Sequence, residues 1–234
     1  MTQDMENFEE ADYFFPNERT ILFIDGNNLY QSARGLGVSI DFNRLRAYFK
    51  YRCGPITRAY YYTALPNPNK STQTTRHLAN WLSHNGYSVV SKEIREYTSG
   101  RGERVQKGNL DVDIAVDCME LIPYMDHAIL FSGDSDFLPL VHALKRKGIR
   151  VTVVSTRKTP TPAISDEFRM AADGYIDIFA IREHVQSEPT WTTDATKPWG
   201  FVEDIHEPQR HGQNHTENDT STSSIKTNKF TTPV

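Results

Sequence analysis

The chain has 234 residues, of which 38% are apolar and 24% charged, which is enough for one large domain with an appendage. No apolar run approaches the roughly 18 residues that cross a bilayer, and the acidic N-terminus lacks the pattern of a secretory signal. Because only two cysteines occur, Cys53 and Cys118, a disulfide scaffold is also excluded, and we expect a cytoplasmic protein without a membrane partner.

Charge is distributed unevenly along the chain. Residues 1–18 contain six acidic residues and no Lys or Arg, and residues 186–234 contain seven acidic and four basic residues. The intervening residues 19–185 carry 22 bases and 17 acids, a net charge of +5. Residues 206–224 have no apolar side chain and cannot offset the entropy cost of folding. We therefore predict an acidic N-terminal extension (1–18), a basic folded domain (19–185) and a low-complexity, disordered C-terminal tail (186–234). An apolar patch within residues 191–205 of this tail either folds back onto the domain or docks a protein partner.

Short β-branched or aromatic runs alternate with helical stretches across the predicted domain. In chain order, the predicted strands are Thr20–Ile24, Arg58–Thr63, Tyr87–Val90, Ala128–Phe131, Ile149–Val154 and Tyr175–Ile178. The predicted helices are Leu29–Arg34, Phe42–Arg52, Thr74–His84, Asp111–Tyr124, Phe137–Arg146 and Ala163–Ala172. Such alternation implies βαβ crossovers, and therefore an α/β fold with a mostly parallel sheet covered on both faces. The polar, glycine-containing segment Glu93–Asn109 is predicted to form a mobile loop or a hairpin.

Acidic residues follow two of the predicted strands, at the sheet edge where open α/β sheets bind ligands. The first strand leads into Asp25-Gly26-Asn27-Asn28, and the fourth into Ser132-Gly133-Asp134-Ser135-Asp136. Turn formation alone explains Asp25, and helix capping explains either Asp134 or Asp136. Capping needs one acid rather than two, so the second turn indicates a functional site more strongly than the first.

A third acid, Asp111, begins the predicted helix 111–124. Counting about 100° per residue places Asp111 on the apolar face of this helix, toward the sheet. Asp113 and Glu120 fall on the opposite, solvated face, whereas Asp117 flanks Leu121 and fits either face. A carboxylate directed at a sheet is costly unless something compensates it; the helix dipole compensates a little and a bound cation far more.

If the sheet is parallel, Asp25, Asp111, Asp134 and Asp136 converge at one of its ends. Carboxylates held close together disfavour mutual ionisation, and a divalent cation removes that repulsion. The candidate ligands are all oxygens, without His or Cys, which favours Mg²⁺ or Mn²⁺ over zinc. An acidic metal site within a basic domain fits a phosphodiester substrate.

Several motifs then occur in a fixed order along the chain. They are ILFIDGNNLY (21–30), KGNLDVDIAVD (107–117), ILFSGDSDFLPLV (129–141), VTVVS (151–155) and ISDEFRMAADGYIDI (164–178). In this order they resemble the NYN domain family of PIN-like nucleases, in its LabA-like bacterial branch, over roughly residues 19–182. The resemblance implies a PIN-like three-layer α/β/α sandwich around a mostly parallel central sheet.

The resemblance also implies a metal-dependent ribonuclease. In it, Asp25, Asp111 and Asp134 would hold one or two Mg²⁺ or Mn²⁺ ions, directly or through water, with Asp136 adjoining them as a further catalytic acid. Asn28 would steady a metal-bound water or a phosphate oxygen. The metal would lower the pKa of a water that attacks phosphorus. Asp117 matches an acid common in this branch, but the resemblance gives it no role.

Basic residues near the predicted site are candidates for RNA binding. Lys107 belongs to a matching motif and would contact a phosphate, although a solvated loop lysine explains it nearly as well. Arg101 and Arg104 would attract the backbone independently of sequence. Arg157 and Lys158 follow a predicted strand and would lie at the same edge of a parallel sheet.

Two functions from different classes stay open at this point. The first is a ribonuclease, because each core acid of the pattern is present. The second is a noncatalytic RNA-binding or regulatory module that keeps the PIN-like fold and its acidic pocket. Both have RNA as the partner, and homodimers are common among PIN-like domains.

Overall fold

The computed structural model describes residues 14–65, 74–93, 95–98, 104–107 and 110–187. The predicted tail falls outside these residues except for its first two positions, and so do residues 1–13 of the predicted N-terminal extension. Among the described residues, no helix is both long and apolar enough to cross a membrane.

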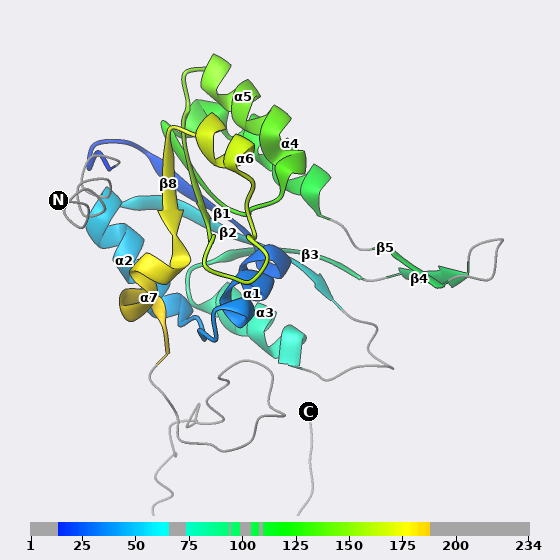
Figure 1. Ribbon diagram of the computed structural model, residues 1–234. Helices are drawn as coiled ribbons and strands as arrows, with labels where there is room; N and C mark the ends of the chain where they lie inside the picture. The colour runs from blue at the N-terminus through cyan, green and yellow to red at the C-terminus, as the bar shows by residue number, and fades with distance from the viewer. Residues whose placement is uncertain (1–13, 66–73, 94, 99–103, 108–109, 188–234) are drawn as a thin grey trace, which may run out of the picture. The chain divides into compact units, whose positions relative to one another are not determined.

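A six-stranded sheet forms the centre of the fold, and every neighbouring pair of its strands is parallel. The spatial order of the strands is β3-β2-β1-β6-β7-β8, so β1 lies in the middle (Figure 1). These strands are β1 (Thr20–Asp25), β2 (Ile56–Leu65), β3 (Ser88–Glu93), β6 (His127–Phe131), β7 (Arg150–Ser155) and β8 (Gly174–Asp177). A separate antiparallel pair, β4 (Arg95–Thr98) and β5 (Arg104–Lys107), makes a hairpin between β3 and the next helix.

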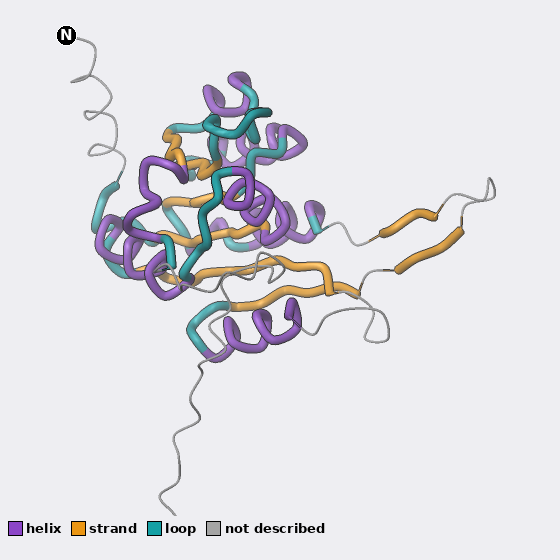
Figure 2. Tube along the Cα trace, turned by 60° about the horizontal axis from the view of Figure 1, so that its bottom comes forward, coloured by secondary structure: helices purple, strands orange, loops and turns teal. Residues whose placement is uncertain are grey.

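Helices cover both faces of the sheet. One layer contains α1 (Gly26–Gly35), α2 (Phe42–Cys53), α3 (Thr74–His84) and α7 (Ile178–Val185), and the other α4 (Asp111–Glu120), α5 (Leu138–Arg146) and α6 (Asp166–Ala171). Figure 2 shows the strands lying between helices. The alternation along β1 explains the two cores: Leu22 and Ile24 pack with the first layer, and Ile21 and Phe23 with the second.

The predicted three-layer α/β/α architecture is confirmed, with each predicted strand and helix found near its expected position. The predicted helix Asp111–Tyr124 ends earlier, at Glu120, and continues as the 3₁₀ helix η2 (Ile122–Tyr124), because Pro123 cannot extend the helical hydrogen bonds. Residues 178–185 form α7, which the sequence analysis did not predict; Asp177 ends β8 and caps this helix by accepting from the Phe179 N–H at 2.9 Å. The segment Glu93–Asn109 contains the hairpin rather than only a loop.

A buried polar cluster closes the amino end of the sheet. His127 is fully buried, and its Nε2 lies 2.8 Å from the Thr152 hydroxyl. Arg150 lies between Glu18, at 3.0 Å, and the Nδ1 atom of His127, at 2.9 Å. Because the guanidinium of Arg150 can only donate, Nδ1 accepts, so the imidazole is neutral with its proton on Nε2. Burial, and then the charge of Arg150, lowers the pKa of His127 to about 3.

We expect this histidine to make the fold sensitive to acid. Below pH 6.5 the unfolded chain protonates His127 and the folded chain does not, so the free energy of unfolding falls as pH falls toward 3. The loss approaches about 1.4 kcal/mol per pH unit. Urea unfolding of wild type and His127→Gln across this range measures it. A constant difference in stability between the two proteins at all pH values would contradict the prediction.

Candidate metal centre

The candidate site lies where the strand order of the sheet reverses. From β1 the chain proceeds outward to β2 and β3, and then returns to β6 on the other side of β1. The chain therefore leaves the carboxyl ends of β1 and β6 toward opposite faces of the sheet, and open α/β sheets bind ligands at such a point. Asp25 ends β1, and the turn 132–136 follows β6, so the topology brings the two predicted acidic turns together.

Asp25 is partly buried and caps α1. One oxygen of its carboxylate accepts hydrogen bonds from the backbone N–H groups of Asn27 and Asn28, both at 3.1 Å. Burial raises the pKa of Asp25, these two bonds lower it, and the charges of Asp111 and Asp134 raise it again, so that it lies at about 6. Asp25 therefore lies within electrostatic reach of both other predicted metal ligands.

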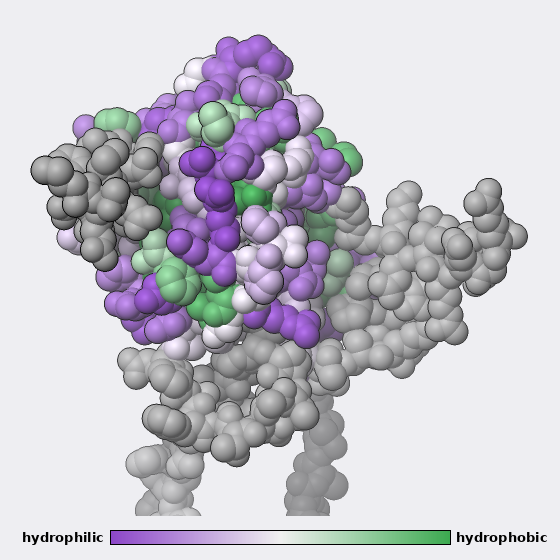
Figure 3. Space-filling view, in the orientation of Figure 1, coloured by the Kyte–Doolittle hydropathy of each residue, from purple (hydrophilic) through white to green (hydrophobic). Residues whose placement is uncertain are grey.

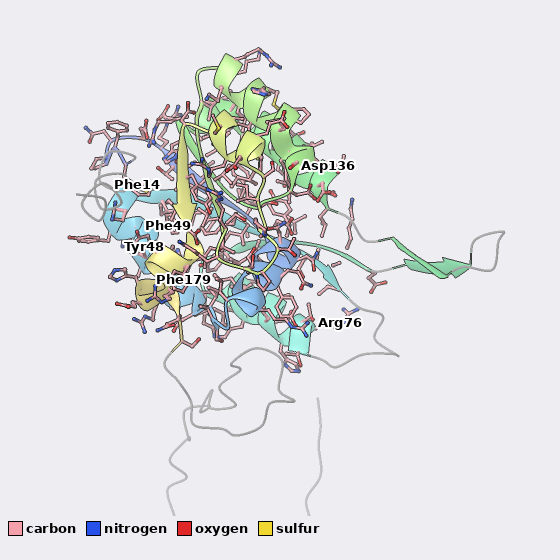
Figure 4. All side chains as sticks on the ribbon, in the orientation of Figure 1. Phe14, Tyr48, Phe49, Arg76, Asp136 and Phe179 are labelled. Atoms are coloured by element: carbon pink, nitrogen blue, oxygen red, sulfur yellow. The ribbon has the colours of Figure 1, made fainter. Side chains whose placement is uncertain are left out.

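Three further acids form a tight cluster beside Asp25. Asp111, Asp134 and Asp136 each offer a carboxylate oxygen within 4.8 Å of the other two. Asp111 is the first residue of α4, and Asp134 caps the 3₁₀ helix η3 (Ser135–Phe137) by accepting from the Asp136 N–H at 2.9 Å. Asp136 is exposed and is labelled in Figure 4. The sequence thus predicted the members of this cluster, while Asp25 lies outside the 4.8 Å group.

Hydrogen bonds of Asn28 and Ser132 connect the two acidic turns. The Asn28 side-chain oxygen accepts from the Gly133 N–H at 2.9 Å. The Ser132 hydroxyl accepts from the Asp134 N–H at 3.2 Å and lies 3.5 Å from Asp25. The predicted role of Asn28 concerned a bound water or phosphate, whereas in the structure its oxygen positions the second turn. The sequence analysis assigned no role to Ser132, although its place directly after a buried strand was a usable signal.

Gly133 is required by close packing at this turn. A Cβ atom there would lie 1.9 Å from the carbonyl oxygen of Ala163 and 2.5 Å from the hydroxyl oxygen of Ser155. Gly26, in the first turn, is similarly constrained, because a Cβ would lie 2.7 Å from the backbone oxygen of Tyr62. The glycines of both motifs therefore allow close approach of backbone to its neighbours.

Two other acids of α4, Asp113 and Asp117, have protein partners. The Tyr62 hydroxyl, on β2, donates to Asp117 at 2.8 Å. Burial and this bond both raise the pKa of Tyr62, so it stays protonated and donates. Asp113 forms an ion pair with Lys92 on β3. Asp117 therefore anchors α4 to the sheet, a role that the helix periodicity left undecided.

The predicted substrate-binding residues lie in two places. Arg157 and Lys158 follow β7 and are exposed, and Arg157 lines a cavity of about 440 Å³ together with Gly133 and Ser135. Arg157 also pairs with Asp166 at 3.5 Å. Arg104 and Lys107 are the first and last residues of β5, and three residues separate β5 from α4. The side chains of Arg104 and Lys107 fall outside the described part of the structure.

The residues present fit a hard divalent cation. The cluster supplies only carboxylate oxygens, which Mg²⁺ and Mn²⁺ prefer. Among the described residues, no Lys or Arg forms a salt bridge with Asp25, Asp134 or Asp136. The raised pKa of Asp25, which comes from burial and then from the charges of Asp111 and Asp134, is therefore not lowered by a salt bridge from Asp25 itself to an arginine or lysine of the described residues.

A parallel sheet with an aspartate cluster at its switch point is typical of PIN-like, nuclease-related α/β proteins. The comparison with protein families agrees, since the NYN domain model matches residues 19–179. The chain belongs to the NYN domain family.

Individual relatives are consistent with this assignment. The chain is 35% identical over 175 residues to the low amplitude and bright protein LabA of Synechococcus elongatus, covering 74% of this chain and 90% of LabA. It is 32% identical over 77 residues to an uncharacterised protein of Methanocaldococcus jannaschii, covering 32% of this chain and 30% of that protein. A crystal structure of a Vibrio parahaemolyticus protein of unknown function has the same fold, with a TM-score of 0.58 and 24% identity over 72% of this chain and 96% of the other.

Proposed function

We propose that this protein is a ribonuclease that hydrolyses RNA phosphodiester bonds with a divalent cation, Mg²⁺ or Mn²⁺, held by Asp25, Asp111 and Asp134. The observation that carries the proposal is the convergence of Asp111, Asp134 and Asp136 within 4.8 Å, with Asp25 close enough for its pKa to respond to Asp111 and Asp134. Nuclease-related function is general in the NYN family, which supports hydrolysis over binding alone.

Each acidic or polar residue of the site would have its own role. Asp111 and Asp134 would hold the cation, because their oxygens are close together, and Asp25 would complete its ligands from the end of β1. A bound cation would supply a water of lowered pKa and neutralise charge on the departing oxygen. Asp136 is exposed beside Asp111 and Asp134, and it would accept a proton or bind a water next to the cation. Asn28 and Ser132 would keep the two turns in register.

Basic residues at the edge of the site would bind the RNA backbone. Arg157 and Lys158 extend from the end of β7, next to the turn that carries Asp134. Arg104 and Lys107 belong to the hairpin that immediately precedes Asp111 in the chain. Such contacts are independent of sequence and weaken as salt rises.

An RNA cleavage assay tests the proposal. Labelled single-stranded and structured RNAs are incubated with the purified protein in Mg²⁺, in Mn²⁺ or with EDTA. We expect cleavage that requires the metal and that Asp134→Asn abolishes. Glu120→Gln serves as the matched control, because Glu120 is an exposed acid at the far end of α4, and it should cleave like wild type.

The same assay separates the enzyme from a noncatalytic module. Binding of RNA without products in either metal, unchanged by Asp134→Asn, would refute the ribonuclease and favour RNA binding alone. Cleavage that persists in EDTA would refute the metal.

A further inference from the structure

A second cavity lies beside the acidic cluster and takes no part in the metal centre described above. It has a volume of about 450 Å³ and lies between the first turns of α1 and the loop that connects β7 to α6. Its polar lining comes from Asn27, Gln31 and Ser32 on α1 and from Thr159 and Thr161 on the loop. In Figure 1 this loop descends from α6 to the level of α1.

One of the residues that line the cavity has a hydroxyl that the described part of the protein does not use. Ser32 is only 2% exposed, and its hydroxyl oxygen has no hydrogen-bond partner among the described residues. A buried hydroxyl without a partner is costly, and such groups in folded proteins call for an explanation. Thr159, by contrast, donates its hydroxyl to the carbonyl of Thr161 at 2.6 Å, which fixes the shape of the loop. The loop side of the cavity is therefore held in shape by a hydrogen bond, whereas the α1 side contains the unpaired hydroxyl of Ser32.

The chemistry of the lining restricts the ligand. Among the described residues that line the cavity, none is charged. A phosphate would require cations or a cluster of N–H donors, and a metal ion would require carboxylates. Amides and hydroxyls both donate and accept, which suits a neutral, planar group carrying donors and acceptors on its edge. The ring of Pro160 adds an apolar surface at the rim.

The cavity is adjacent to the metal centre through the backbone itself. Asn27 and Asn28 line the cavity, and their N–H groups donate to Asp25 at 3.1 Å. Ala163 lines both this cavity and the one that Arg157 lines, so the loop divides the edge of the sheet into two compartments. A group bound here would therefore lie next to the turn that carries Asp25.

We propose that the cavity between α1 and the 159–163 loop binds one nucleobase of the RNA strand, next to the phosphate that the acidic cluster receives. This inference rests on the proposed function, since the acidic cluster defines where the phosphate lies. Bases of single-stranded RNA are read by hydrogen bonds to their edges, and the exposed side chains of Gln31 and Thr161 supply them here. The protein therefore prefers certain bases at one position of its substrate.

Equilibrium binding in EDTA tests the nucleobase site without depending on cleavage. Fluorescence anisotropy gives the Kd of short labelled homopolymers of A, C, G and U. We expect wild type to prefer one of them, and Gln31→Ala and Thr161→Val each to reduce that preference by about threefold to tenfold, the effect of one hydrogen bond. Both residues are exposed, so neither change should unfold the protein.

Asn80→Ala is the matched control, because it removes an exposed amide from α3, outside the cavity, and should leave the preference unchanged. Equal Kd values for the four homopolymers, absence of binding, or an unchanged preference in both variants would overturn the proposal. Base preference in EDTA together with no cleavage in Mg²⁺ or Mn²⁺ would uphold the nucleobase site and refute the ribonuclease.

Discussion

Asp25→Asn should stabilise the metal-free protein while removing the proposed RNA cleavage. Ionised Asp25 is disfavoured by burial and by its acidic neighbours, which raise its pKa from 3.8 to about 6. This shift corresponds to about 2–3 kcal/mol of folding free energy lost at neutral pH. Asparagine keeps an oxygen for the N–H groups of Asn27 and Asn28, so the cap of α1 survives. We expect a Tm higher by about 4–10 °C in EDTA.

The same change should abolish metal-dependent RNA cleavage. A ligand carboxylate should matter at least as much as an outer-shell partner, whose loss lowers activity by about tenfold to 100-fold. A substitution that raises stability and destroys function indicates a site kept strained for its ligand. A Tm that falls by many degrees would instead show that Asp25 is a structural residue.

The stability difference between Asp25→Asn and wild type should depend on pH. Above pH 6 both folded and unfolded chains carry ionised Asp25, and its full cost is present; the cost disappears as pH falls toward 3.8. The advantage of Asp25→Asn over wild type should therefore be largest at neutral pH and vanish near pH 4. Asp41→Asn is the matched control, because Asp41 caps α2 through the Arg44 N–H at 3.0 Å and is not part of the acidic cluster. Its stability should match wild type throughout.

Gly133→Ala should be the most damaging conservative substitution among the described glycines. The new methyl group would overlap the carbonyl oxygen of Ala163, whose own N–H donates to the carbonyl of Thr156 at 3.0 Å. The loop cannot retreat without breaking that bond, so we expect a loss of about 3 kcal/mol or more in the free energy of unfolding. Movement of the turn would also displace Asp134 and reduce cleavage.

Gly148→Ala provides the comparison, measured by urea unfolding at the same pH. Gly148 has a φ of +80° with nothing within 4 Å of an added Cβ, so alanine there meets only backbone strain. That strain costs about 1–2 kcal/mol. If Gly133→Ala were as mild as Gly148→Ala, the loop would not be packed against the turn as tightly as the distances indicate.

The strands and most helices were predictable because their signals are local. The runs Thr20–Ile24 and Ala128–Phe131 are continuously apolar or β-branched, as strands buried on both faces must be. Helix α7 was not predicted because Ile176 and Ile178 continue the strand pattern. The boundary between β8 and α7 depends on the hydrogen bond by which Asp177 caps the helix, and the periodicity of apolar residues does not reveal such a bond.

Short segments were enough to predict which acids follow the buried strands and that they suit a hard cation, because strand ends, helix faces and ligand chemistry are local properties. The long-range contacts became known from the folded structure: Asp111, Asp134 and Asp136 meet while Asp25 lies outside their group, Asn28 accepts from Gly133, and Tyr62 donates to Asp117. Asp111 and Asp134, Asn28 and Gly133, and Tyr62 and Asp117 are each far apart in the chain. Their distances follow from strand order and from the packing of α4 on the sheet, which no local pattern records.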